Sequence, residues 1–247
     1  MSRRVAIDSA RMAWWLTAWL GGRISPDDLF AAVLDGDAAH HVTGLDGGTE
    51  PEPLLLALGP IRRSGAVSAG LALPVAGDLV GLGGPAGFNA LALAAGEAVV
   101  LAGAGLGLVP HRAGAGVVWQ AVPADRRPLD DLGTADRNLR RSISASADAL
   151  VDLDVARWRP EVADELMSLH RSPSYAAPAG TPSRAVDLAG RASQALAIVD
   201  LALADDGAAV SARQAQARTA ALQPLARAGR RAMVAACSPE VWPPEPA

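Results

Sequence analysis

The chain has 247 residues, of which 50% are hydrophobic, and its formal net charge at pH 7 is −4. Such a chain can form one large globular domain or two small ones, and its charge gives no overall attraction to nucleic acid. The sequence contains no lysine, so all 22 strongly basic residues are arginine, and P-loop phosphate binding and Schiff-base catalysis are excluded.

The single cysteine, Cys237, excludes an internal disulfide and a CxxC metal site. A chain without disulfides is typical of the cytoplasm. Near the start, Arg3-Arg4 precedes an apolar run as in an export signal, but Asp8 and Arg11 interrupt the region that such a signal needs to be apolar. We therefore expect a cytoplasmic, soluble protein with no membrane association.

The first 50 residues predict a pair of helices. Apolar side chains recur at helical spacing over 12–19, and Asp8 or Ser9 is placed to cap that helix. Ser25, followed by a proline and two aspartates, is typical of the start of a second helix. Trp14 lies off the main stripe, so it is a candidate contact to a partner.

Residues 54–123 predict a sheet, because short apolar runs rich in valine alternate with glycine and proline. The segment Phe88–Ala95 fits a strand or a helix, and the hairpin-like sequence AAGEAVV that follows it favours a strand. Between Ser64 and Pro110 only Asp78 and Glu97 are charged. Such a sheet must be covered on most of both faces, by flanking helices or by a second subunit.

Residues 134–237 predict helices. The Pro/Ser-rich segment 171–183 is the best internal linker, and Pro224 is expected to kink the last helix near its middle. The predicted helices begin at Thr134, Pro160, Ser183 (ending near Ala204) and Ser211.

Together these elements predict an α+β fold, in which a mostly antiparallel sheet of about four to six strands packs against an N-terminal helical pair and a C-terminal helical bundle. We expect a single domain over 1–240 and a Pro-rich tail over 241–247. Its expected parts are helical over 1–50, sheet over 54–123 and a helical bundle over 134–237, and if the domain divides, the boundary lies near 125–133.

Two glycine-containing motifs resemble functional loops. The sequence GLGGPA at 81–86 fits the dinucleotide fingerprint G-x-G-x-x-A, but Pro85 removes one of the amides that would bind a pyrophosphate, and no acidic residue follows at the required distance. The sequence AVSAG at 66–70 resembles a nucleophile elbow at Ser68, but a strand and not a helix is predicted after it. We interpret both as structural, so no catalytic residue and no cofactor are predicted.

The sequence DGDAAHH at 35–41 brings together carboxylates and imidazoles, which are metal ligands in many proteins. Neighbouring histidines on a helix point in different directions, and no second ligand cluster is evident. We interpret the segment as a polar helix end with surface histidines and predict no metal site, although whether His40 or His41 binds anything stays open.

Basic residues mark two candidate contact sites. His111 and Arg112 form a pair at a probable strand end, where they can bind an anion or form a hairpin tip. In the last helical region, Arg227, Arg230 and Arg231 share one face. That face can contact phosphates or an acidic partner, or it can pair with acidic residues of the same chain.

Three segments in the helical part are similar to proteins of high-GC actinobacteria that have no assigned function. They are LVDLDVARWRPEVADELM, ALAIVDLALADDGAAVSA and RRAMVAACSPEVWPP. This resemblance implies no activity, no cofactor and no catalytic residue.

The sequence favours a non-catalytic interaction or regulatory protein that self-associates as a homo-oligomer, through the apolar sheet or the tryptophan-bearing helix; no protein partner is identified. One alternative is a small-molecule-binding domain or enzyme that uses the glycine-rich loop at 81–86 and His111. The other is weak binding of nucleic acid or an acidic partner through the arginines of the last helix.

Overall fold

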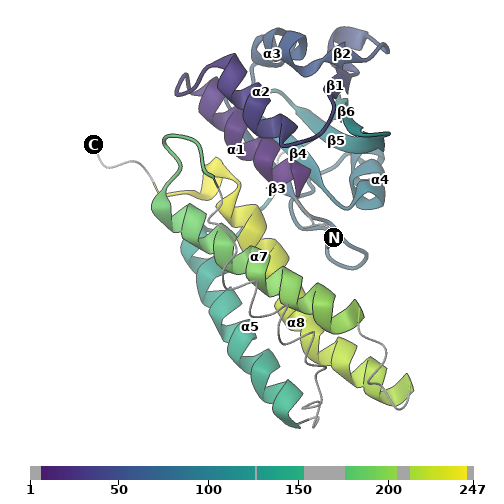
Figure 1. The fold of residues 1–247 in the computed structure, drawn as a ribbon, viewed down its shortest axis with the longest axis vertical. Helices are drawn as coiled ribbons and strands as arrows, with labels where there is room; N and C mark the ends of the chain where they lie inside the picture. The colour runs from purple at the N-terminus through teal and green to yellow at the C-terminus, as the bar shows by residue number, and fades with distance from the viewer. Residues whose placement is uncertain (1–6, 126, 153–175, 205–211, 244–247) are drawn as a thin grey trace.

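The structure, a computed structural model, describes residues 7–125, 127–152, 176–204 and 212–243. Within these ranges the fold is α+β, as predicted: a six-stranded sheet lies among four helices, and three longer helices extend from one side of it (Figure 1).

The sheet has the strand order β2-β1-β6-β5-β4-β3. Four of its five strand pairings are antiparallel and one, between β1 and β6, is parallel, which confirms a mostly antiparallel sheet. The strands are β1 (His40–Thr43), β2 (Glu52–Pro53), β3 (Ser68–Ala72), β4 (Ala98–Ala102), β5 (Leu106–Ala113) and β6 (Gly116–Pro123).

One face of the sheet is covered by three helices from the first quarter of the chain: α1 (Asp8–Leu20), α2 (Pro26–Leu34) and α3 (Leu54–Arg63). Their apolar side chains and the inward side chains of the strands form one buried cluster, in which Leu16, Ile61 and Trp119 have no exposed surface. The Ser25 hydroxyl accepts a hydrogen bond from the Asp28 amide and caps α2, as the sequence predicts.

The other face is covered by α4 (Ala86–Ala95), which packs Phe88 and Ala92 against the sheet. The interpretation of Phe88–Ala95 as a strand was therefore wrong. The glycine after the segment, Gly96, has a φ of 80° and ends a helix, where the sequence suggested a hairpin turn.

Two further parts of the sheet region differ from the prediction. The apolar run that begins at Leu54 is α3, and this helix continues through Pro60. The histidine segment contributes the strand β1 and not the end of a helix, because His40 and Val42 point into the core while His41 and Thr43 are only half-buried.

The helical bundle is formed by α5 (Leu132–Asp152), α7 (Ser183–Ala204) and α8 (Ala212–Ala236). The bounds of α7 are those predicted, and α8 continues as a helix through Pro224. The helix predicted to begin at Pro160 lies outside the described residues.

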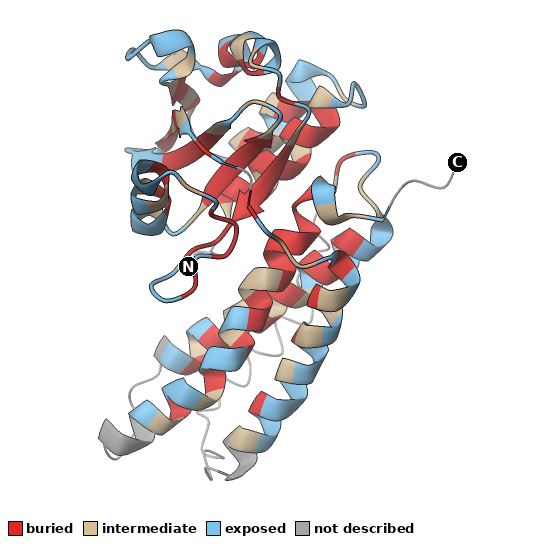
Figure 2. Ribbon diagram, turned by 180° about the vertical axis from the view of Figure 1, so that it is seen from behind, coloured by how far each residue is buried: buried red, intermediate tan, exposed pale blue. Residues whose placement is uncertain are grey.

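The bundle meets the edge of the sheet and not its face. The backbone N–H of Leu71 in β3 donates to the Cys237 carbonyl at 3.3 Å and to Ser238 Oγ at 3.2 Å, and the Trp14 indole N–H donates to the Ala236 carbonyl at 3.0 Å. The residues at and just after the end of α8 thus cover the outer edge of β3 and supply hydrogen-bond acceptors to it. Figure 2 shows the result: buried residues fill the sheet and the near end of the bundle, while the far end is mostly exposed.

The residues that directly follow α8 pack against the bundle. Residues Pro239–Val241 form a 3-10 helix, and Trp242 packs against the bundle. Arg127, which is 6% exposed, pairs with Glu240 at 3.0 Å and so ties this segment to the connection between sheet and bundle. No helix among the described residues has the length and apolar character needed to cross a membrane.

Candidate functional site

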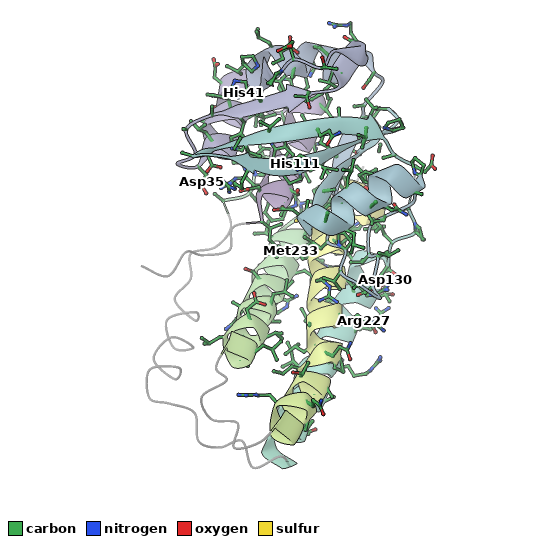
Figure 3. All side chains as sticks on the ribbon, turned by 90° about the vertical axis from the view of Figure 1, so that its right-hand side faces the viewer. Asp35, His41, His111, Asp130, Arg227 and Met233 are labelled. Carbon is green, nitrogen blue, oxygen red and sulfur yellow. The ribbon has the colours of Figure 1, made fainter. Side chains whose placement is uncertain are left out.

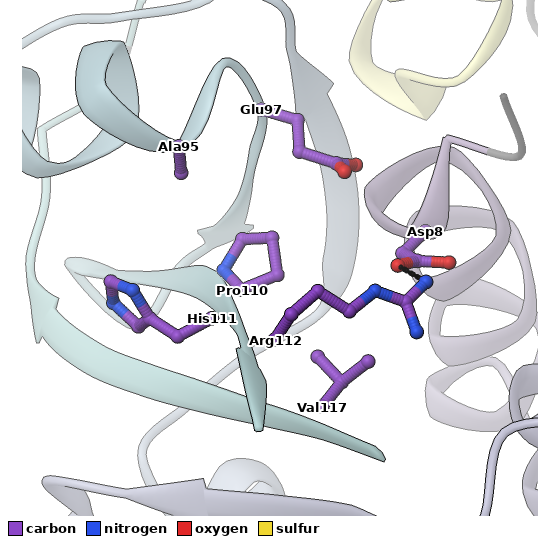
Figure 4. Close-up of a pocket in the computed structure, with 7 residues that line it drawn as sticks. All are labelled: Asp8, Ala95, Glu97, Pro110, His111, Arg112 and Val117. Atoms are coloured by element: carbon purple, nitrogen blue, oxygen red, sulfur yellow. Dashed lines mark hydrogen bonds and ion pairs between the residues drawn. The ribbon is translucent and has the colours of Figure 1, made fainter. Parts of the chain in front are cut away.

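A polar pocket of about 330 Å³ opens where the N-terminus of α1 meets the ends of β4, β5 and β6 (Figure 4). Its lining combines two carboxylates, a guanidinium and an imidazole with apolar side chains. The lining residues are Asp8, Ala95, Glu97, Pro110, His111, Arg112 and Val117. His111 and Arg112, which the sequence singled out, therefore line one pocket.

Arg112 crosses the mouth of the pocket and is held by two aspartates. Its Nη2 lies 2.6 Å from Asp8 Oδ2, and its Nη1 lies 2.6 Å from Asp37 Oδ1. The second oxygen of Asp8 accepts from Arg11 at 2.8 Å, and Arg11 also pairs with Asp35. The guanidinium of Arg112 is thus paired with two carboxylates of the same chain.

His40 supports this arrangement from inside the core, where it is 2% exposed. The Trp119 indole N–H donates to His40 Nδ1 at 3.0 Å, so Nδ1 carries no proton and Nε2 must carry it. Nε2 then donates to Asp37 Oδ2 at 3.1 Å. Burial lowers the pKa of His40, although the hydrogen bond with Asp37 opposes that shift.

His40 is thus a structural core histidine and not the surface residue that the sequence suggested. Both of its ring nitrogens are used, and a second proton on Nδ1 would face the Trp119 N–H. Among the residues that the structure describes, no group of three or more His, Cys, Asp or Glu side chains is placed to hold a metal ion.

Glu97 lies on the opposite wall of the pocket. One carboxylate oxygen accepts the Ser9 backbone N–H at 2.7 Å, which satisfies one of the free amides in the first turn of α1. The sequence suggested Asp8 or Ser9 as the cap of this helix, but the N-cap position is Ile7, which makes no side-chain cap. Burial raises the pKa of Glu97, and the charge of Asp8 adds to this, whereas the hydrogen bond from Ser9 and the charge of Arg112 oppose it.

His111 lies at the rim of the pocket and is exposed to solvent. Its Nε2 lies 3.2 Å from the amide oxygen of Gln120 on the adjacent strand. The sequence analysis did not select Glu97 as a site residue. The signal that could have found it is that Glu97 is one of only two charged residues between Ser64 and Pro110.

The arginines of the last helix lie at a different place. Arg227, Arg230 and Arg231 converge on the carboxylate of Asp78, which is the other isolated charge of the apolar stretch. Of the alternatives that the sequence left open for these arginines, the structure shows pairing with an acidic residue of the same chain.

The glycine-rich loop at 81–86 does not adopt the context of a dinucleotide site. No strand leads directly into it, and Gly81, with a φ of 88°, packs so closely on β3 that an added Cβ would lie 2.5 Å from the Ala72 Cα. The Gly84 amide donates to Asn89 Oδ1 at 3.1 Å, and the Gly84 carbonyl accepts from Asp125. These contacts explain the loop as structural.

Ser68 and Cys237 are also structural. Ser68 is the first residue of β3 and is followed by strand, so it does not form a nucleophile elbow. Cys237 is 1% exposed, and burial raises the pKa of its thiol far above the ordinary value, which leaves it protonated and unreactive.

Comparison with known proteins identifies the family. Residues 9–132 match the N-terminal domain of the Rv1486c-like proteins, and residues 133–234 match the C-terminal domain of the same family. The chain belongs to the Rv1486c-like family. No solved structure matches it.

The chain is similar along nearly its whole length to mycobacterial relatives. It is 31% identical, over 95% of this chain and 98% of the relative, to "Uncharacterized protein Rv1486c" of Mycobacterium tuberculosis (strain ATCC 25618 / H37Rv). It is 28% identical, with the same coverage, to "Uncharacterized protein ML1804" of Mycobacterium leprae (strain TN). The resemblance to uncharacterised actinobacterial proteins is therefore confirmed.

Proposed function

We propose that this protein binds a small polar molecule that carries a positively charged nitrogen, in the pocket beside Glu97. The observation that carries the proposal is the Glu97 carboxylate, which faces the pocket, is half-buried, and makes no direct ion pair with a described residue, although the charge of Arg112 acts on it across the pocket. Partial burial of a carboxylate that makes no direct ion pair is unfavourable, and a bound ammonium group would reduce that penalty.

The charges around the pocket support a cationic ligand. Four carboxylates and two guanidiniums form the group, so two negative charges are in excess. The carboxylates are those of Asp8, Asp35, Asp37 and Glu97, and the guanidiniums are those of Arg11 and Arg112. Asp8 is neutralised through both oxygens, which leaves Glu97 as the carboxylate that a ligand would meet.

We retain the non-catalytic role expected from the sequence. Among the described lining residues there is no Ser, Thr, Cys or Tyr that could act as a nucleophile, and the guanidinium of Arg112 is fixed by two ion pairs. A binding or sensing role requires only that a cationic ligand balance the excess negative charge around the pocket. The cytoplasmic location also stays a prediction, as does self-association.

The two surfaces first considered for self-association are occupied within the chain. Trp14 is 3% exposed and donates to the Ala236 carbonyl, and the central strands of the sheet are covered by α1 on one face and α4 on the other. A homo-oligomer would therefore have to use other surfaces.

The test is a thermal-shift and calorimetric comparison of ethanolamine and putrescine with the uncharged analogues ethylene glycol and butanediol. We expect the amines to raise the melting temperature of the wild-type protein and the uncharged analogues to have no effect. The variant Glu97→Gln should lose the response, because it keeps the shape of the side chain but not its charge. The matched control Asp46→Asn, which changes an exposed acidic residue in the 3-10 helix Leu45–Gly47, should keep the response.

Two results would contradict the proposal. One is an equal response to the charged and uncharged compounds. The other is an amine response that survives unchanged in Glu97→Gln.

A further inference from the structure

The second candidate site is formed by three arginines of α8 and one aspartate from the connection between β3 and α4. Asp78 Oδ1 lies 3.0 Å from Arg231 Nη2, and Asp78 Oδ2 lies 3.2 Å from Arg230 Nη2 and 3.6 Å from Arg227 Nε. Asp130 joins the edge of the group, 3.6 Å from Arg231 Nη1. Figure 3 shows Arg227 and Asp130 on the same side of α8.

The charges in this group do not balance. Three guanidiniums meet two carboxylates, which leaves one positive charge in excess. Each guanidinium has five N–H donors, so most of the fifteen donors have no part in these ion pairs. The Nε of Arg230 is buried and has no hydrogen-bond acceptor among the described residues.

The group is open to solvent on one side. The side chain of Asp78 is 4% exposed, whereas those of Arg231 and Arg227 are 41% and 54% exposed. Asp78 therefore forms the floor of the group, and the two exposed guanidiniums form its outer rim. An anion that approaches from solvent meets arginine before it meets aspartate.

We propose that Arg227, Arg230 and Arg231 form a binding site for a phosphate group, and that the Asp78 carboxylate occupies part of this site as a built-in competitor. Arginine is well suited to phosphate because its planar donors bind two oxygens at once. Without the charge of Asp78 the group would carry two positive charges in excess, which matches a phosphate dianion.

The size of the rim favours a single phosphate group over a nucleic acid. The exposed donors come from two arginines one helical turn apart, which spans one phosphate and not a row of them. The loop that carries Asp78 is a tight turn in which Val75 and Asp78 exchange backbone hydrogen bonds. A conformational change in this turn would move the Asp78 carboxylate away from the arginines.

The experiment compares the wild-type protein with Asp78→Asn, and uses Asp130→Asn as the matched control at the edge of the same group. Binding of inorganic phosphate and of pyrophosphate is measured by calorimetry and thermal shift, against chloride at the same ionic strength. We expect Asp78→Asn to bind phosphate about tenfold more tightly than the wild type, because a like charge a few ångströms from the anion has been removed. Asp130→Asn should change the affinity by much less.

Phosphate should also restore the melting temperature of Asp78→Asn more than chloride does. A purely structural role for the arginines predicts a loss of stability with no preference between the two anions, and that result would overturn the proposal. Tighter binding of a short random DNA duplex than of pyrophosphate would overturn it in favour of a nucleic-acid surface.

A second variant keeps the proposal testable if Asp78→Asn does not fold. In the wild-type protein, phosphate at millimolar concentrations should raise the melting temperature above that in chloride. The double variant Arg227→Gln, Arg231→Gln should lose this difference, and its persistence would refute the site.

Discussion

Asp78 and Glu97 are the two isolated charges of the apolar stretch between Ser64 and Pro110, and the protein treats them in opposite ways. Asp78 is surrounded by three guanidiniums, whereas Glu97 is held by one backbone N–H and faces a pocket. A carboxylate in direct ion pairs joins parts of a fold, and one that makes no direct ion pair can form one with a ligand.

The largest difference between the two should appear in stability. Asp78→Asn removes the carboxylate shared by three arginines, so the free energy of unfolding should fall by about 2 kcal/mol, less than for a fully buried pair because two of the arginines are partly exposed. Urea denaturation in chloride buffer measures the change. Asp130→Asn, measured in parallel, should lose much less, and equal losses would mean that Asp78 is not the centre of the group.

A smaller effect concerns the histidine behind Arg112. The pKa of His40 is lowered in the folded state, so the unfolded chain takes up the proton first as the pH falls below about 6.5. The contribution of neutral His40 to the free energy of unfolding is therefore complete above that pH. Below it, the free energy of unfolding falls by up to about 1.4 kcal/mol for each pH unit, until His40 is also protonated in the folded state.

The variant His40→Gln should therefore be less stable than the wild type at pH 7. Its free energy of unfolding, measured by urea denaturation at each pH, should change less between pH 7 and pH 5. The adjacent residue gives the control, because His41→Gln changes a half-buried side chain on the other face of β1. An unchanged slope in His40→Gln would show that this histidine does not titrate in the way described.

The smallest effect should come from Glu97→Gln, and it should have the opposite sign to that of Asp78→Asn. Because the pKa of Glu97 is raised in the folded state, its ionised form opposes folding as the pH rises through that pKa. At pH 7 and without ligand, the amide should increase the free energy of unfolding by about 1 kcal/mol or less. A clear loss of stability would indicate that Glu97 serves mainly to cap α1.

Local sequence patterns predicted those helices and strands whose residues fit only one period of apolar side chains. The bounds of α7 match the helix predicted from Ser183 to near Ala204, and β3, β4 and β6 lie in the region predicted as sheet from its short apolar, valine-rich runs. The apolar run that begins at Leu54 and the segment Phe88–Ala95 were misread as sheet because alanine and leucine in short apolar runs fit either period. Their helical state is decided by packing on the two faces of the sheet.

The candidate sites could be predicted only in part. His111 and Arg112 were found because they adjoin a predicted strand end, but Asp8 lies 104 positions before Arg112, and Glu97 lies before a different strand. Only the pairing of β4 with β5 and the packing of α1 beside β4 bring these side chains together. The choice of Asp78 as the partner of the arginines likewise depends on how the bundle meets the sheet.

The hydrogen bonds at Leu71 have a consequence for how the protein is assembled. The strand β3 obtains acceptors for its outer edge from Ser238 and its neighbour Cys237, and Ser238 lies 167 positions further along the chain. Until those residues have left the ribosome, the Leu71 N–H lacks these acceptors and can pair with another polypeptide, whereas the Ala69 N–H on the same edge is already bound by Thr17 Oγ1 of α1. A chain interrupted between the two family domains would keep that edge open, so we expect the isolated first half to aggregate unless the second half is supplied in trans.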